Sequence, residues 1–365
     1  MPDGNAHRQI HYPCERRAYD SSQFWLAHFL VVATTADAGS GDRRVSLLDE
    51  LVDSEFVKIS RSPDFDNVRS IDALGQANSI PLDCKDFAAS FATLRLKGCT
   101  IYLQRTFPRI LQMQYATPGA IVGLLMEDAA SLIVNGLEAR GPAFLVVKGA
   151  ATCEIVEPQS NLVALVNFDT IDGRGWPGEI DRAQVITTEP AKLDVLRTTL
   201  RDALHLASHS PDTLLQPGMI EGVEESILQA VDLAMAAASP APEARRLSLS
   251  HYLSLVQKFD EFVAANAGKT LYSADVARQF GVSVRTLHNA VVAIRGMSMH
   301  RYMRLRRLWS VRQQLLRGEP PQSIKAVALM NGFWHMGEFT ALYRELFGEA
   351  PQQTLASRKT AGEPL

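Results

Sequence analysis

Four polar residues in the C-terminal third have the types and the spacing needed to read the edges of DNA bases. They lie on the outward side of a predicted helix over 284–295: Arg285, Thr286, His288 and Asn289. The inward side carries apolar residues at helical spacing: Leu287, Val291 and Ile294. An arginine can bind guanine O6 and N7, an asparagine can bind adenine N6 and N7, and a histidine can donate to a base or a phosphate. The pattern predicts a helix that enters the major groove.

The segment before this helix has the features of a helix-turn-helix. A short helix is predicted over 274–280, with Ser273 as its N-cap and the small Ala277 allowing a close helix crossing. Gly281 can adopt the positive φ of the turn, and Ser283 is the expected N-cap of the next helix.

A second unit of the same kind follows 51 residues later. Ala328 and Gly332 are separated by four residues, as in the first unit, and Ser323 is the expected N-cap. A second reading helix is predicted over about 336–347. The residue before it and its outward side offer few groups that bind bases: His335, Met336, Gly337, Thr340, Ala341 and Arg344. This half is expected to touch thymine methyl groups, to read shape, or to anchor on phosphate, with helix capping as the alternative for His335.

A long helix over about 298–317 joins the two units. Its arginines do not share one face: Arg301, Arg304, Arg306, Arg307 and Arg312. Some of them, Arg304 included, are expected to contact phosphate, and the others to stay solvated or to pair with acids. Trp309 and Trp334 are expected to lie in the core.

Several short motifs of this region resemble one known family. They are Val282–Leu287, Gly296–Ser298, Tyr302-Met303, Arg306–Leu308, Gly332-Phe333, Phe339, Tyr343, Phe347-Gly348 and Pro351. On these motifs, residues 273–358 resemble the DNA-binding domain of the AraC/XylS family of bacterial transcriptional regulators, in the branch that contains the activator of ethanolamine-utilisation operons. Two features depart from the family pattern: the usual acid after Gly-Phe is missing, and Thr354-Leu355 stands where an aromatic residue and an arginine are usual.

The resemblance implies two reading helices held about one helical turn apart by the joining helix, so that they meet successive major grooves. It also implies an N-terminal cupin-like barrel for effector sensing or dimerisation, and it favours an activator that works with RNA polymerase.

The middle of the chain reads as an antiparallel sandwich or barrel. Short β-rich segments are separated by turn signals: 100–105, 110–115, 120–126, 131–135, 143–147, 152–156 and 162–167. A small barrel of this kind can hold one small ligand. Helical periodicity follows in Leu193–Leu204 and Ile220–Ala234, which predicts either a dimer interface or helices that pack on their own barrel. Before the barrel, residues 49–52 and 87–91 are expected to be helical.

These readings give an α+β multidomain chain. It consists of an N-terminal cupin-like β-barrel or sandwich with flanking helices and a C-terminal all-α double helix-turn-helix domain. The boundaries are a region of unclear role (1–90), a β-rich effector or dimerisation domain (91–178), a helical connector (179–238), a linker (239–249) and the DNA-binding domain (250–358).

Charge separates the two ends of the chain. Residues 255–358 carry 14 Lys and Arg against 7 Asp and Glu, whereas residues 1–254 carry 22 against 32. A basic C-terminal third suits a nucleic-acid module joined to a module with another task. The expected partners are therefore double-stranded DNA, RNA polymerase, a small-molecule effector and a second copy of the chain.

Neither a metal site nor a cofactor is expected. The four cysteines lie 70, 15 and 54 residues apart, so they form no Cys-x-x-Cys pair and read as reduced, packed thiols. His205 and His209 lie one helical turn apart, but no third ligand is in view. The apolar run 24–33 is too short to span a bilayer, which favours a cytoplasmic protein without a membrane partner.

Two classes of function remain open. The first is an effector-responsive transcriptional regulator. The alternative is a DNA-targeted enzyme with a catalytic N-terminal domain. We prefer a protein that is not an enzyme, because the sequence contains no Gly-x-Ser-x-Gly, phosphate-binding glycine loop or His-Glu-x-x-His motif. A barrel lining without clustered His, Cys or carboxylate groups would argue against the enzyme.

Overall fold

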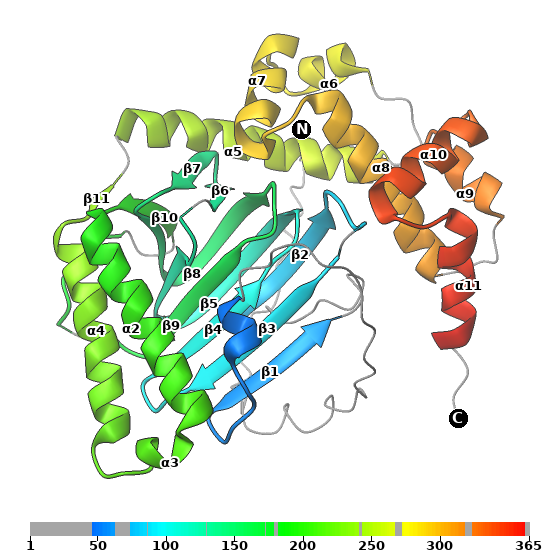
Figure 1. The fold of residues 1–365 in the computed structure, drawn as a ribbon. Helices are drawn as coiled ribbons and strands as arrows, with labels where there is room; N and C mark the ends of the chain where they lie inside the picture. The colour runs from blue at the N-terminus through cyan, green and yellow to red at the C-terminus, as the bar shows by residue number, and fades with distance from the viewer. Residues whose placement is uncertain are drawn as a thin grey trace, which may run out of the picture. The chain divides into compact units, whose positions relative to one another are not determined.

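Alternating apolar residues of the middle segment form an antiparallel sheet, as the sequence predicts. The computed structural model describes residues 46–62, 74–85, 87–128, 130–171, 173–178, 182–240, 243–266, 272–317 and 323–361, all within one compact unit, Val45–Leu365. Cys14 and the apolar run 24–33 lie outside the described residues. The α+β architecture is confirmed, with a sheet domain followed by a helical domain (Figure 1).

Eleven strands of the described residues belong to this sheet. They are β1 (Val57–Ser62), β2 (Gly75–Pro81), β3 (Ala89–Arg95), β4 (Cys99–Arg105), β5 (Arg109–Leu125), β6 (Ser131–Val134), β7 (Leu137–Arg140), β8 (Ala143–Glu157), β9 (Leu162–Phe168), β10 (Arg182–Thr187) and β11 (Ser239–Pro240). The main order is β1-β3-β4-β9-β5-β8-β10-β11, with β2 on β5 and the β6–β7 hairpin on β8.

Strands β5 and β8 are longer than predicted. Each runs through a segment that the sequence reading treats as a turn between two strands, so that prediction is wrong. The two strands stay paired on both sides of a register shift between Ala116 and Ala120. A Cβ on Gly119 would lie 2.1 Å from the carbonyl oxygen of Phe168, so only glycine fits this close approach. The turn-like residues therefore mark a bulge within a continuous strand.

The first 90 residues contribute β1, β2 and the start of β3 to the sheet. The helix predicted over residues 87–91 is wrong. Strand β3 begins there at Ala89 and pairs with both β1 and β4. The expected helix near residue 49 is the single turn α1 (Leu47–Glu50). The role of this region is thus partly structural.

Helices α2 (Pro190–His209) and α4 (Met219–Ala236), joined through α3 (Pro211–Leu214), lie along one face of the sheet (Figure 1). Their apolar stripes share one core with sheet residues such as Val122 and Val166. The stripes predicted from the sequence, around Leu196 and Val231, therefore pack on the chain's own sheet. β10 also falls in the predicted connector, where no strand is expected from the sequence.

In its described residues the C-terminal region contains helices joined by short turns and no strands. Its helices are α5 (Glu243–Ala265), α6 (Ser273–Gln279), α7 (Val284–Arg295), α8 (Met299–Arg317), α9 (Ile324–Met330), α10 (Met336–Phe347) and α11 (Pro351–Ala361). α5 begins inside the segment predicted as a linker. The helical core also includes Ile80, Ile110 and Val156 of the sheet, so the two domains share apolar packing. Among the helices that the structure describes, none is long and apolar enough to cross a membrane.

Candidate nucleic-acid interface

The first helix-turn-helix is formed by α6 and α7. Gly281 has φ +66°, as the turn requires, and the Ser283 hydroxyl accepts a hydrogen bond from the Thr286 amide at 3.0 Å. Both features confirm the prediction. The predicted cap at Ser273 is wrong, because α6 begins one residue earlier than expected: Tyr272 is the N-cap and its side chain makes no capping bond.

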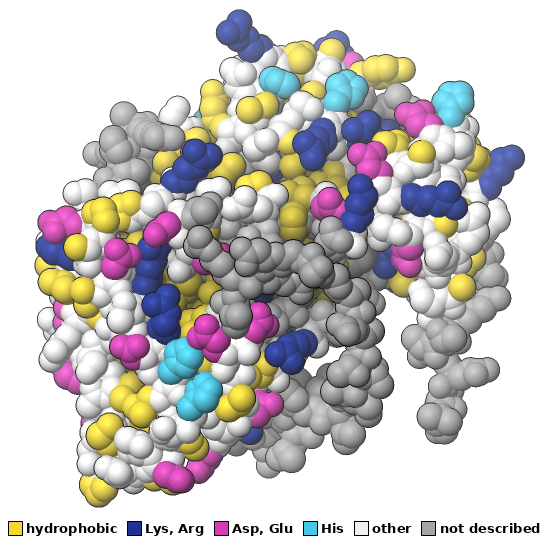
Figure 2. All heavy atoms as spheres, viewed as in Figure 1, with side chains coloured by type: hydrophobic (Ala, Val, Ile, Leu, Met, Phe, Trp, Pro, Cys, Tyr) yellow, Lys and Arg dark blue, Asp and Glu magenta, His cyan; other side chains and the backbone are white. Residues whose placement is uncertain are grey.

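The outward face of α7 presents three of its four predicted reading residues to solvent. Arg285, His288 and Asn289 are exposed. Thr286 is half-buried, and its hydroxyl lies 2.8 Å from the Ser283 hydroxyl, so it mainly supports the cap. Figure 2 shows Lys, Arg and His side chains spread over the visible face of the helical region, mixed with fewer acids.

A surface groove lies beside this reading face. It is lined by Ser273, Val284, Arg285, His288, Ser298, Met299 and His300. Ser298 and His300 are exposed at the start of α8, and the Ser298 hydroxyl caps that helix by accepting from the Arg301 amide at 3.3 Å. Neither residue is predicted from the sequence as a DNA contact. A capping serine followed by a histidine is the signal that could have found them, because free amides at a helix N-terminus attract phosphate.

The second helix-turn-helix is formed by α9 and α10. Gly332 has φ +79°, and the Ser323 hydroxyl accepts from the Ala326 amide at 3.1 Å, so this cap is confirmed. His335 is the exposed N-cap residue of α10, but its side chain makes no capping hydrogen bond. The capping alternative for its ring therefore finds no support.

The outward face of α10 is as poor in base-binding groups as predicted. Gly337, Ala341 and Arg344 are exposed, whereas Met336 is half-buried against the core. The Thr340 hydroxyl donates to the Met336 carbonyl at 2.9 Å, so its hydrogen is not available to donate to a base. The arginine is the one cationic group among these predicted α10 residues.

The two tryptophans differ from one another. Trp309 is half-buried and packs on Phe347 with ring centroids 6.3 Å apart, in line with the prediction. Trp334 is 67% exposed, so its core placement is wrong. Phe333 faces inward instead, and its ring centroid lies 5.1 Å from that of Phe339. The next residue, Trp334, therefore points outward.

The arginines of α8 fall into two groups. Arg301 and Arg304 are exposed, as a phosphate contact requires. Arg306 approaches Asp260 at 3.7 Å, and Arg312 is buried against Glu349. Arg307 is half-buried, and this burial lowers the pKa of its guanidinium.

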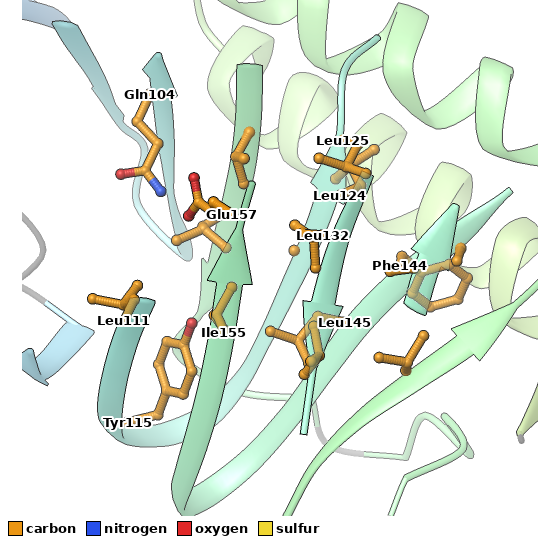
Figure 3. Close-up of a pocket in the computed structure, with 17 residues that line it drawn as sticks. Gln104, Leu111, Tyr115, Leu124, Leu125, Leu132, Phe144, Leu145, Ile155 and Glu157 are labelled. Carbon is orange, nitrogen blue, oxygen red and sulfur yellow. The ribbon is translucent and has the colours of Figure 1, made fainter. Parts of the chain in front are cut away.

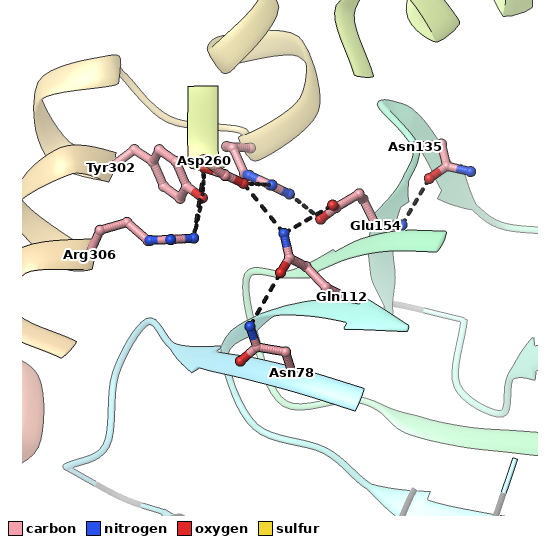
Figure 4. Close-up of polar contacts among 8 residues, drawn as sticks. Asn78, Gln112, Asn135, Glu154, Asp260, Tyr302 and Arg306 are labelled. Carbon is pink, nitrogen blue, oxygen red and sulfur yellow. Dashed lines mark hydrogen bonds and ion pairs between the residues drawn. The ribbon is translucent and has the colours of Figure 1, made fainter. Parts of the chain in front are cut away.

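A buried polar network connects α7 to the sheet (Figure 4). The Arg295 guanidinium binds Glu154 of β8 and, at 2.6 Å, Asp260 of α5. Tyr302 donates to Asp260 at 2.6 Å, and the Gln112 amide donates to Glu154 at 3.1 Å. Burial raises the pKa of Glu154, and the neighbouring guanidinium opposes that shift. The sequence does not predict this role for Arg295, since helical periodicity alone does not show that a charge is buried.

Other candidate groups of the sequence are held in structural contacts. His205 lies 2.9 Å from Glu50, and the His209 ring lies 3.2 Å from the His205 carbonyl. The part of the chain that the structure describes contains no group of three or more potential metal ligands. Cys99 and Cys153 are buried, and burial raises the pKa of both thiols, that of Cys99 to about 12.

The interior of the sheet domain bears on the enzyme alternative. Its cavity is lined almost entirely by apolar residues, with Glu157 as the single carboxylate and without any histidine or cysteine. The clustered groups that the enzyme alternative needs are not found in this lining.

Comparison with known proteins identifies the C-terminal region. Residues 276–357 match the model of a helix-turn-helix domain. The chain is 33% identical over 96 residues to a probable thc operon regulatory protein of Rhodococcus erythropolis, covering 26% of this chain and 29% of the relative. It is 33% identical over 102 residues to a XylDLEGF operon transcriptional activator of Pseudomonas putida, covering 27% and 31%.

The matched part thus spans less than a third of these curated relatives. A solved probable AraC family transcriptional regulator from Rhodopseudomonas palustris is 31% identical, covering 29% of this chain and 97% of that one, with a TM-score of 0.27. That score is too low to support an argument about shape. The assignment to the ethanolamine branch stays a prediction.

Proposed function

We propose that this chain, which carries an AraC-type helix-turn-helix domain over 276–357, is a sequence-specific DNA-binding transcriptional regulator that responds to an effector. The observation that carries the proposal is the pair of helix-turn-helix units with outward-facing α7 and α10, joined by the single helix α8. One rigid connection between two reading helices suits binding to successive major grooves of one duplex.

The two units contribute differently in this proposal. α7 reads bases with Arg285, His288 and Asn289, because these exposed groups match the donor and acceptor pattern of the major groove. Thr286 has a lesser role, because it supports the cap. α10 contacts thymine methyl groups and recognises the shape of the DNA through Met336, Gly337, Thr340 and Ala341. His335 and Arg344 bind phosphate groups.

Phosphate contacts between the two units position the duplex. Arg304 is exposed on α8, and Ser298 and His300 lie at the N-terminus of that helix, next to Arg285 in the groove. Helix N-termini and guanidiniums are the usual phosphate partners, and they fix register without reading sequence.

We extend the proposal to transcription activation with RNA polymerase as a partner, because the Pseudomonas putida relative is named a transcriptional activator. A regulator of this kind acts in the cytoplasm, so the same proposal places the protein there. A homodimer belongs to the same proposal, with the outward sides of α2 and α4 as the candidate surface, since Val195 and Leu233 are exposed there.

Selection from a random duplex pool with the full-length chain tests this function. The expected result is one enriched sequence with two protected major-groove segments about one helical turn apart, the first more strongly specified than the second. A folded chain that enriches no sequence would contradict the proposal. Transcription by RNA polymerase from a promoter that carries the selected site should rise when the chain is added, and a fall would contradict activation.

A further inference from the structure

A cavity lies within the sheet domain, outside the DNA-binding residues. Strands from β4 to β10 line it, and its enclosed part is small. Most of its walls are aliphatic, as Leu132, Leu145 and Ile155 illustrate (Figure 3). Such a lining accepts an apolar molecule.

One end of the cavity is polar. Glu157 and Gln104 lie at this end, and the Tyr115 hydroxyl points toward it (Figure 3). Glu157 is 2% exposed, and its Oε1 accepts from Arg109 Nε at 3.3 Å and from Nη2 at 3.1 Å. Oε2 is also buried, yet it has no hydrogen-bond partner among the described residues. A buried acceptor without a donor is costly, so this oxygen is the group that a ligand would satisfy.

The charges at this end restrict the ligand. Arg109 already balances Glu157, so the pair as a whole is neutral. A cationic ligand would leave an uncompensated charge between apolar walls, and a carboxylate would place its oxygens against Oε2. A neutral hydroxyl or N–H avoids both costs.

We infer that the cavity binds a small, uncharged, largely apolar molecule whose single hydroxyl or N–H donates to Oε2 of Glu157. The site itself depends on no DNA contact. Its role as the effector site rests on the proposed regulator function.

The strands around the cavity also connect it to the first reading unit. On β6, Leu132 and Val134 line the cavity, whereas Ile133 lies beside Gly296 at the end of α7, 3.2 Å from where its Cβ would be. On β8, Ile155 lines the cavity and its neighbour Glu154 binds Arg295 of α7. Successive strand residues point to opposite faces, so a ligand that moves these strands also moves contacts of α7.

Four para-substituted toluenes test the ligand class with the full-length chain: p-cresol, 4-methylanisole, p-toluate and 4-methylbenzylamine. Calorimetric titration should give the tightest binding for p-cresol, with 4-methylanisole weaker by roughly tenfold or more because it cannot donate. The two charged probes should bind more weakly than p-cresol. Equal binding of p-cresol and its methyl ether, tightest binding of either charged probe, or no binding of any probe would overturn the inference.

Two variants test the location of the site. Ala139→Leu fills the lining and should abolish p-cresol binding, whereas Ala116→Leu, on an exposed position of β5, should leave it unchanged. Glu157→Gln should weaken p-cresol at least severalfold, with Glu127→Gln in the surface pair with Arg105 as its control. Glu157→Gln leaves Arg109 without its charged partner and can impair folding. Ala139→Leu is therefore the decisive variant, and unchanged p-cresol binding in it would contradict the location of the site.

DNA binding of the full chain without any probe separates this inference from the proposed function. A chain that binds its selected duplex but no probe overturns the ligand class alone. A chain that binds p-cresol but enriches no duplex overturns the regulator alone.

Discussion

Glu154 on β8 and Arg295 at the end of α7 form a buried ion pair, although they are 141 residues apart in the sequence. Asp260 and Arg306 extend it, so that two carboxylates face two guanidiniums. The pair joins the sheet domain to the helix that carries Arg285 and His288. The position of the first reading helix is therefore tied to the sheet and not only to its own helix-turn-helix.

Removal of the Glu154 charge should destabilise the chain. Glu154→Gln leaves Arg295 buried with only one carboxylate, and breaking a buried pair of this kind costs about 3–5 kcal/mol. Urea unfolding of the full chain should show a loss near the lower end of that range, because Asp260 still binds Arg295. Glu138→Gln, in the exposed pair with Arg140, is the control and should cost less than about 1 kcal/mol. Similar losses in the two variants would contradict a structural role for the buried pair.

Substitution of Arg285 should weaken DNA binding in a sequence-dependent way. Arg285→Ala should cost about 1–3 kcal/mol on the selected duplex and relax the preference at one base pair, because a guanidinium that reads guanine is lost. Competition binding with the selected and a random duplex measures this, with Arg140→Ala as the control on the sheet. Equal weakening on both duplexes would mean that Arg285 contacts phosphate and reads no base.

The phosphate contacts should appear in the salt dependence of binding. A plot of log K against log salt for the full chain should fall steeply, since each neutralised phosphate releases counterions. Arg304→Ala and Arg344→Ala should each reduce the slope by about 1 without changing base preference. Lys97→Ala, whose exposed ammonium lies near Glu221, should leave the slope unchanged. A flat salt profile of the wild-type chain would contradict the electrostatic part of the interface.

The buried thiols should resist alkylation while the chain is folded. Burial raises the pKa of the Cys99 thiol from 9.0 to about 12. Between pH 9.0 and about pH 12 the thiol ionises in the unfolded chain but not in the folded one. The contribution of Cys99 to the free energy of unfolding therefore falls as the pH rises above 9.0. Peptide-level mass spectrometry after iodoacetamide treatment at pH 8 should find Cys99 and Cys153 labelled only in denaturant. Rapid labelling of the native chain would show that these thiols are reached without unfolding.

Both helix-turn-helix units can be predicted from residues that lie close together in the sequence. Their Ser283 and Ser323 caps, the glycines of their turns and the period of their apolar residues act within about one or two helical turns, so local stereochemistry is sufficient to define them. Ser273 shows the limit of this precision, since helix ends are decided by small energy differences between neighbouring residues. The identities on the outward face of α7 were equally readable, because an amphipathic helix fixes which residues face outward.

Features that depend on partners far along the chain cannot be predicted in this way and follow from the folded arrangement. β5 and β8 continue through turn-like residues because each pairs with the other on both sides of the bulge. β1 and β3 are strands because their partners hold them in the sheet, whereas their own residues give a weak signal. The exposure of Trp334, the burial of Arg295 and the unpartnered oxygen of Glu157 follow in the same way, since long-range packing and not local propensity sets the surroundings of a side chain.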